Sequence, residues 1–171
     1  MRSGRFMFLA VWLAAVGPAW GLWGSRAETI KALQRQFGAG RYDEVIAQLD
    51  PAGIAQLDPA GRLGLRGDDL RRAYALLAAS YEVTGRLDNS LSVYQVGARL
   101  FPRDRDLLER LAMLLHRAGL EEQAQPAYEQ LVAVEPGNAL GHLGLAQIDH
   151  ALGFLDRSAD HYEKALDGLP G

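Results

Sequence analysis

The chain has 171 residues, of which 49% are hydrophobic and 23% charged, so it can bury a sizeable core and is not a disordered tail. Its formal net charge is −3 and its basic residues are scattered, which argues against a nucleic-acid-binding protein. It contains no cysteine, which excludes disulfides, thiolate zinc sites and a thiol nucleophile.

The first 25 residues have the layout of a secretory signal peptide. Arg2 and Arg5 precede an apolar run, which Gly17 and Pro18 interrupt. Residues 6–25 also form 20 consecutive uncharged positions, close to the ~20 that a membrane-spanning helix needs. The sequence therefore predicts either a cleaved signal peptide or an anchor in the inner membrane. In both cases the rest of the chain is extracytoplasmic, and periplasmic in a double-membraned bacterium.

Residues 26–67 read as a degenerate helical hairpin. Ile30 and Leu33 form the apolar face of a first helix, Gly40 supplies the turn, and Val45 and Leu49 belong to a second helix. This hairpin is followed by an insertion.

The insertion comes from an octet, IAQLDPAG, that is written twice over residues 46–61. Asp50 and Asp58 each precede a proline and are expected to restart short helical turns, because aspartate is a good N-cap and proline suits the first helical turn. We interpret the doubling as a slippage event tolerated in a surface loop.

The remainder, residues 68–171, repeats with a period of 34. Small, glycine, aromatic and proline positions all recur at this step. The matching columns are Leu77, Leu111 and Leu145; Ala78, Ala112 and Ala146; Gly85, Gly119 and Gly153; Ser90, Ala124 and Ser158; Tyr94, Tyr128 and Tyr162; and Pro102, Pro136 and Pro170.

Each period predicts a helical hairpin. Tyr74, Leu77 and Tyr81 recur at helical spacing, and Gly85 then ends the first helix. A second apolar stripe follows and must stop near Pro102, which cannot continue a helix. Small residues in the Ala78 and Ser90 columns are expected where the two helices cross, because they let the backbones approach.

Two segments, HRAGLEEQAQPAYEQLVAVEPGN and HALGFLDRSADHYEKALDGLPG, resemble tetratricopeptide repeats. The resemblance implies an all-α fold, a right-handed superhelix of antiparallel helical hairpins. The degenerate hairpin is followed by three repeats, at about 68–103, 104–137 and 138–171. His142, Asp149 and Gly97 depart from the family pattern, and the first two are expected to loosen the packing of the last repeat.

The resemblance also implies a concave wall, lined by the first helix of each hairpin, that binds a peptide or a partner's helix. In this chain the wall residues are Lys31, Gln34, Arg72, Glu82, Asp106, Glu109, Arg110, Met113, His116, Arg117, Gln147 and His150. The family's clamp for a C-terminal carboxylate is absent, because its places hold Ile30, Gln34, Ala75 and Ala79.

Two histidines, His116 and His150, lie one repeat apart and would stack on adjacent hairpins. They could share a metal or respond to acidic pH, which leaves a metal-binding or catalytic envelope protein as the alternative function. Spacing fixes no third ligand, and no nucleophile motif or phosphate loop occurs. We therefore predict no metal, no cofactor and no enzymatic activity.

Together with the leader, the resemblance to tetratricopeptide repeats implies a scaffold for protein–protein interaction in an envelope assembly, such as a pilus, secretion, polysaccharide-export or cytochrome-maturation machine. Its expected partners are proteins or peptides, with no nucleic acid, and the membrane is contacted only through an uncleaved leader. The apolar end beyond Tyr162, Leu166 and Leu169 is expected to accept a partner or a second copy of the chain.

Overall fold

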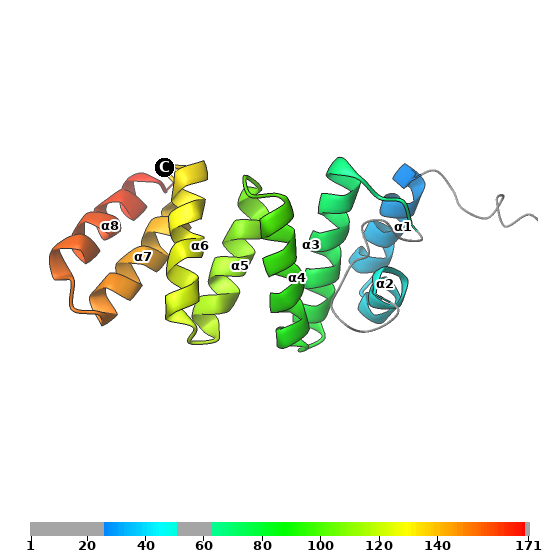
Figure 1. The fold of residues 1–171 in the computed structure, drawn as a ribbon, viewed down its shortest axis with the longest axis horizontal. Coiled ribbons are helices and arrows are strands. Elements are labelled where there is room, and N and C mark those ends of the chain that lie inside the picture. Colours follow the sequence, from blue (N-terminus) through cyan, green and yellow to red (C-terminus); the bar gives the residue numbers. More distant parts are fainter. Residues whose placement is uncertain (1–25, 51–62, 170–171) are drawn as a thin grey trace, which may run out of the picture.

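The computed structural model describes residues 26–50 and 63–169, which form eight helices and no strand. In chain order the helices are α1 (Arg26–Gly38), α2 (Tyr42–Leu49), α3 (Gly67–Val83), α4 (Leu87–Leu100), α5 (Arg105–Arg117), α6 (Glu121–Val134), α7 (Ala139–Ala151) and α8 (Leu155–Asp167). Figure 1 shows them as a row of hairpins that runs from α1 at one end to α8 at the other. The all-α prediction is therefore confirmed.

Each hairpin turns at a glycine in the left-handed region of backbone conformation. The four glycines are Gly40, Gly85, Gly119 and Gly153, with φ between +70° and +81°. The residue after the glycine donates its backbone N–H to a carbonyl in the last turn of the first helix. In the second hairpin, Arg86 N donates to the carbonyl of Tyr81 at 2.9 Å. Only glycine adopts this backbone conformation without strain, so the predicted glycine column is the turn column.

Small residues occupy the helix crossings, as predicted. Ser90 and Ser158 are buried, and their hydroxyls donate to the carbonyls of Ala78 and Ala146 at 2.9 Å in both hairpins. The serines therefore do more than leave space. In the α3–α4 and α7–α8 hairpins they link the second helix to the backbone of the first.

One continuous apolar core runs along the row of hairpins. The second helix of one hairpin packs on the first helix of the next, in the pairs α2–α3, α4–α5 and α6–α7. The second helices α4 and α6 end two residues before Pro102 and Pro136, as the proline column predicts, whereas Pro170 lies outside the described residues.

The first copy of the octet begins inside α2, where Ile46 and Leu49 are buried. Asp50 follows α2 and is buried too, and its carboxylate accepts a hydrogen bond from the Tyr81 hydroxyl at 2.7 Å. The rest of the doubled octet and the predicted leader lie outside the described residues. None of the described helices is long and apolar enough to span a bilayer.

The expected loosening of the last repeat is not seen. Helices α7 and α8 pack closely along their length, and both His142 and Asp149 are buried between them. Polar contacts, described below, replace the apolar contacts that large residues make at these positions in the earlier hairpins.

Candidate functional site

The predicted wall residues lie on α1, α3, α5 and α7, as the repeat pattern requires. Glu82, Glu109, Met113 and His116 are half-buried, and the other eight are exposed. Lys31 and Gln34 line a hollow of about 400 Å³ against α1 together with Glu28 and Arg35. The wall is therefore an accessible surface.

Several wall residues bind other parts of the same chain. Arg117 on α5 forms an ion pair with Glu82 on α3 at 3.0 Å, which links two neighbouring hairpins. Lys31 pairs with Glu28 on its own helix at 3.1 Å. Arg72 forms an ion pair with Asp68 of its own helix at 3.7 Å. Asp106 forms an ion pair with the adjacent Arg105 at 3.0 Å. The centre of the wall consists of the remaining residues of α5 and α7, Glu109, Arg110, Met113, Gln147 and His150.

The two candidate histidines do not form a shared site. His116 turns toward α6, where its Nδ1 lies 2.9 Å from Glu121 Oε2 and its ring meets the edge of Tyr128. His150 is exposed on α7. Within residues 26–50 and 63–169 there is no group of three His, Cys, Asp or Glu side chains placed to hold a metal ion.

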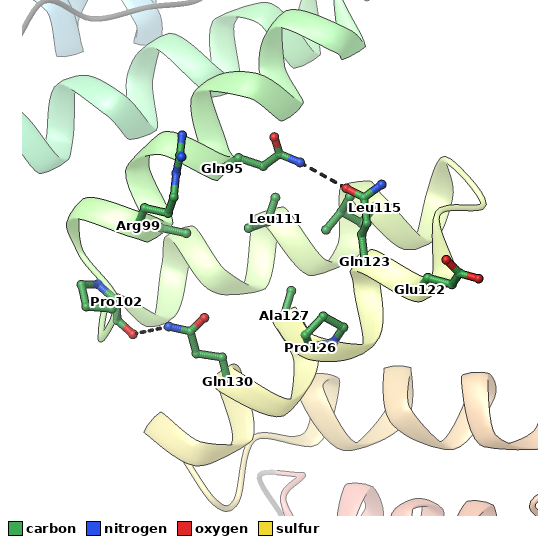
Figure 2. A pocket seen from close by; sticks show the side chains of 11 residues that line it. Gln95, Arg99, Pro102, Leu111, Leu115, Glu122, Gln123, Pro126, Ala127 and Gln130 are labelled. Carbon is green, nitrogen blue, oxygen red and sulfur yellow. Dashed lines mark hydrogen bonds between the residues drawn. The ribbon is translucent and has the colours of Figure 1, made fainter.

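The structure shows a groove that the repeat pattern did not indicate. It lies between the second helices α4 and α6 and has a volume of about 580 Å³. Its floor is apolar and consists of Ala98, Leu111, Leu115 and Ala127, all largely buried. Figure 2 shows Leu111 and Leu115 rising from α5 between the two flanking helices.

Glutamine side chains form the rim of this groove. Gln95 on α4 donates to the Gln123 side chain on α6 at 3.4 Å, and Gln130 donates to the carbonyl of Pro102 at 2.9 Å (Figure 2). Both hydrogen bonds cross the groove and join its two walls. Arg99 on one wall and Glu122 on the other add one charge of each sign.

Proline inside α6 adds a further polar group near the rim. Pro126 has no N–H, so it cannot donate the usual helical hydrogen bond to the carbonyl of Glu122. Both residues line the groove. The Glu122 carbonyl therefore lacks its usual helical donor, and the rim of the groove offers amide donors and amide acceptors above an apolar floor.

The groove and the wall lie on opposite sides of α5. Leu111 and Met113 are two residues apart, which places them about 200° apart around a helix. The resemblance to tetratricopeptide repeats directed attention to the first helices, whereas the groove is formed mainly by second helices. The available signal was the set of uncharged glutamines on α4 and α6, together with a proline in a helix interior.

A second feature missed by the sequence reasoning is a buried polar cluster between α7 and α8. His142 Nε2 donates to the carbonyl of Pro136 at 2.8 Å, and its Nδ1 lies 3.0 Å from Nδ1 of His161. Asp149 Oδ1 accepts from Arg157 at 3.0 Å. The other oxygen of this carboxylate lies 3.9 Å from His161 Nε2 and has no hydrogen-bond partner in the described part of the chain.

Burial lowers the pKa of His161 below its usual value of 6.5, and the adjacent His142 ring acts in the same direction. Asp149 opposes this change because its negative charge favours the imidazolium. The cluster is held inside the hairpin with no described cavity beside it, so we assign it a structural role.

Comparison with solved structures identifies the fold. A crystal structure of MamA superimposes with a TM-score of 0.67 at 17% identity, over 84% of this chain and 78% of that one. A second MamA structure gives a TM-score of 0.66 at 17% identity, over 84% of this chain and 73% of that one. MamA from Desulfovibrio magneticus RS-1 gives 0.64 at 17% identity, over 85% and 77%.

No protein-family model and no curated protein sequence matches the chain. MamA is a tetratricopeptide-repeat protein, and its likeness extends over the hairpins that carry the recurring columns. The chain therefore has the fold of a tetratricopeptide-repeat solenoid.

Proposed function

We propose that this chain is a non-enzymatic scaffold that binds an extended segment of a partner protein in the groove between α4 and α6. The observation that carries the proposal is the combination of a buried apolar floor with a rim of neutral amides in one groove of about 580 Å³. That volume falls within the ~300–1,000 Å³ of typical ligand sites.

An extended peptide suits this chemistry. Its backbone presents N–H and C=O groups along each edge, and a glutamine side chain can donate to one and accept from the other. Every second side chain points the same way, so alternate apolar side chains would cover Leu111 and Leu115 on the floor. The Gln95–Gln123 hydrogen bond is long, at 3.4 Å, and both amides are accessible enough to exchange it for bonds to a peptide.

The centre of the wall is a second contact surface in this proposal. Glu109, Arg110, Met113, Gln147 and His150 present mixed charge around one partly buried thioether, without a described hollow. Exposed charges of this kind contribute little affinity, about 0.2–1 kcal/mol for each pair. We therefore assign affinity to the groove and orientation of the partner to the wall.

A random peptide library displayed on phage, selected on the full chain, tests the groove directly. A selected peptide should bind the Gln130→Ala variant about two- to tenfold more weakly, because loss of one amide hydrogen bond costs roughly 0.5–1.5 kcal/mol. Gln125→Ala is the matched control. It removes an amide from the same helix that donates to Glu129 and, within the described residues, does not line the groove.

Binding that is unaffected by Gln130→Ala but is lost in Arg110→Glu or Glu109→Lys would contradict the groove assignment and favour the wall. Enrichment of no peptide at all would contradict the proposed function.

Location is proposed from the sequence alone. We infer that residues 1–25 export the chain or tether it to the inner membrane, so that the scaffold serves an envelope assembly. Mass spectrometry of the mature protein distinguishes the two states. A mass that lacks about the first 25 residues indicates cleavage, an intact mass in the membrane fraction indicates an anchor, and an intact soluble protein contradicts both.

A further inference from the structure

The outer face of α8 carries an apolar stripe that no described helix covers. Leu155, Ala159, Tyr162 and Leu166 follow one another at steps of four, three and four residues, which places them on one side of α8, and Leu169 follows just beyond the end of the helix. Leu155 is 63% exposed, Leu166 70% and Leu169 59%. In Figure 1, α8 forms the end of the row, with no helix beyond it.

The part of this face around Tyr162 is buried in the two preceding hairpins, whereas Leu87, two repeats before Leu155, is 44% exposed. Tyr94 and Tyr128, two repeats and one repeat before Tyr162, are 2% and 3% exposed, whereas Tyr162 is 39% exposed. Helix α5 packs on α4 and helix α7 packs on α6, and the ring of Tyr128 lies against Gly144 of α7. The stripe on α8 is therefore the surface on which this fold seats one further helix.

An acidic edge runs beside the stripe. Asp156, Asp160, Glu163 and Asp167 each follow a stripe residue by one position, so they repeat the same helical spacing about 100° further around α8. All four are exposed, and only Asp160 has a basic partner within the described residues, Lys164 at 2.6 Å. The occupant should therefore carry positive charge along the matching edge.

We propose that the outer face of α8 binds an amphipathic helix of another protein, with an apolar face against Leu155, Tyr162 and Leu166 and a basic edge against Asp156, Glu163 and Asp167. This surface is separate from the groove between α4 and α6. The helix would lie on α8 as α5 lies on α4, and its length should be similar to the 13 residues of α5 and α7.

Two copies of this chain suit the face less well. If two α8 helices met antiparallel about a two-fold axis perpendicular to them, their acidic edges would lie on the same side of the interface and repel each other. A head-to-tail contact would place the stripe against α1, whose Lys31 and Arg35 suit the acidic edge. The apolar residues Ile30 and Leu33 of this helix are already buried in the core, so the described part of α1 has no apolar face to cover the stripe. A basic amphipathic helix avoids both difficulties.

A synthetic amphipathic peptide tests this assignment on the full chain. The probe is a 14-residue helix with leucine at the stripe-facing positions and lysine along one edge, and the control peptide has glutamate in place of each lysine. Fluorescence anisotropy of labelled peptide measures the Kd. The lysine peptide should bind about tenfold more tightly than the glutamate peptide at low salt, and the difference should shrink as salt screens the charges.

Two exposed substitutions separate the apolar and the charged contributions. Leu166→Asn should weaken binding of the lysine peptide about tenfold, because it removes a leucine of the stripe that is 70% exposed. Glu163→Lys combined with Asp167→Lys should weaken binding of the lysine peptide about five- to tenfold. The same change should strengthen binding of the glutamate peptide. Asp88→Lys, an exposed charge reversal on α4, should change neither value.

Equal affinity for the two peptides, or a charge reversal that fails to exchange their order, would overturn the proposal. So would sedimentation of the chain alone showing a dimer that Leu166→Asn dissociates and the lysine peptide does not displace, because a second copy would then cover the face.

Discussion

Close contact between Tyr128 and Gly144 fixes how the third hairpin meets the fourth. A Cβ atom on Gly144 would overlap the ring atoms of Tyr128. Gly144→Ala should therefore reduce the free energy of unfolding by about 1–3 kcal/mol, because the ring must move within a packed interface. Urea denaturation followed by circular dichroism measures the change.

Gly97→Ala is the matched control at another helical glycine. The Cβ atom it adds would lie 3.4 Å from Leu107 and from Tyr74, which is ordinary contact. Alanine also favours the helix by about 0.5–1 kcal/mol over glycine, so this variant should be as stable as the native chain or more so. Equal destabilisation in both variants would contradict the assigned contact.

The Tyr81 hydroxyl on α3 donates a hydrogen bond to the buried carboxylate of Asp50, which follows α2, and so joins the first hairpin to the second. Burial raises the pKa of Tyr81, and its hydrogen bond to Asp50 raises it further, so the hydroxyl stays protonated and donates. Tyr81→Phe removes this donor and should lower the free energy of unfolding by about 1.5–3 kcal/mol, as expected for a hydrogen bond to a charged group.

Tyr94→Phe is the control for that substitution. Burial raises the pKa of Tyr94 to about 12, but its hydroxyl donates to no other described residue. The control should change stability by less than about 0.5 kcal/mol, the range of substitutions that remove no such contact. Similar losses for the two variants, by the same denaturation assay, would show that the Asp50 contact contributes nothing.

At the scale of single elements, Asp104 both starts α5 and joins it to α3. Its Oδ1 accepts from the Leu107 N–H at 2.7 Å, and its Oδ2 accepts from Arg71 at 2.9 Å. Asp104→Ala removes both contacts and should lower the free energy of unfolding by about 1–2 kcal/mol. Asp104→Asn should lower the free energy of unfolding by less than about 1 kcal/mol. Asparagine can still cap the helix, as Asn138 does for α7, so mainly the ion pair with Arg71 is lost.

Thermal unfolding of the two Asp104 variants separates the cap from the ion pair. If asparagine proves as damaging as alanine, the ion pair with Arg71 dominates and the capping role is wrong.

The α7–α8 hairpin should lose stability in mild acid. The pKa of His161 is lowered in the folded chain, mainly by burial, so the unfolded chain binds a proton more readily. The stabilising contribution is complete above about pH 6.5 and is lost as the pH falls through the lowered pKa. It amounts to about 1.4 kcal/mol for each pH unit that separates the two pKa values.

Hydrogen exchange of α8 amides between pH 7.5 and pH 5 measures this loss after correction for the intrinsic exchange rate. The groups that face His161 are His142, Asp149, Asp160 and Lys164. His161→Gln removes the titrating ring and should flatten the dependence. An unchanged slope in that variant would assign the effect to another group.

For the whole molecule, the recurring columns were sufficient to predict the hairpins and the stacking. Gly85 and its equivalents, the Ser90 column and Pro102 each impose a local backbone or packing requirement, and local requirements can be read directly from a sequence. The degenerate hairpin was also predictable, because Gly40 keeps its turn and Leu33 keeps its burial.

The groove and the polar cluster were less predictable for a physical reason. The groove lies where α4 and α6 pack on α5 and leave a space between them. No single residue encodes that separation. His142, Asp149 and His161 occupy columns that hold other residue types in earlier repeats, so the pattern marks them as departures without saying that they meet. The exposed stripe of α8 and the acidic residues beside it could be expected from their repeated spacing, because both sets recur at helical steps in the sequence.

The molecule as a whole therefore presents three surfaces in different directions. The groove lies among the second helices, the wall lies along the first helices, and the stripe closes the row at α8. A scaffold with separate surfaces can hold more than one partner, and each surface can be disabled without unfolding the others, because hairpins contact mainly their neighbours.

Site-specific photocrosslinking in the source cells tests the central claim most directly. The photoreactive residue p-benzoylphenylalanine replaces Gln123 in the groove or Gln147 on the wall, both of which are exposed. We predict a discrete crosslinked partner from position 123 that is reduced when Gln130→Ala is added and retained with Gln125→Ala. Crosslinks from position 147 alone, with none from position 123, would contradict the account.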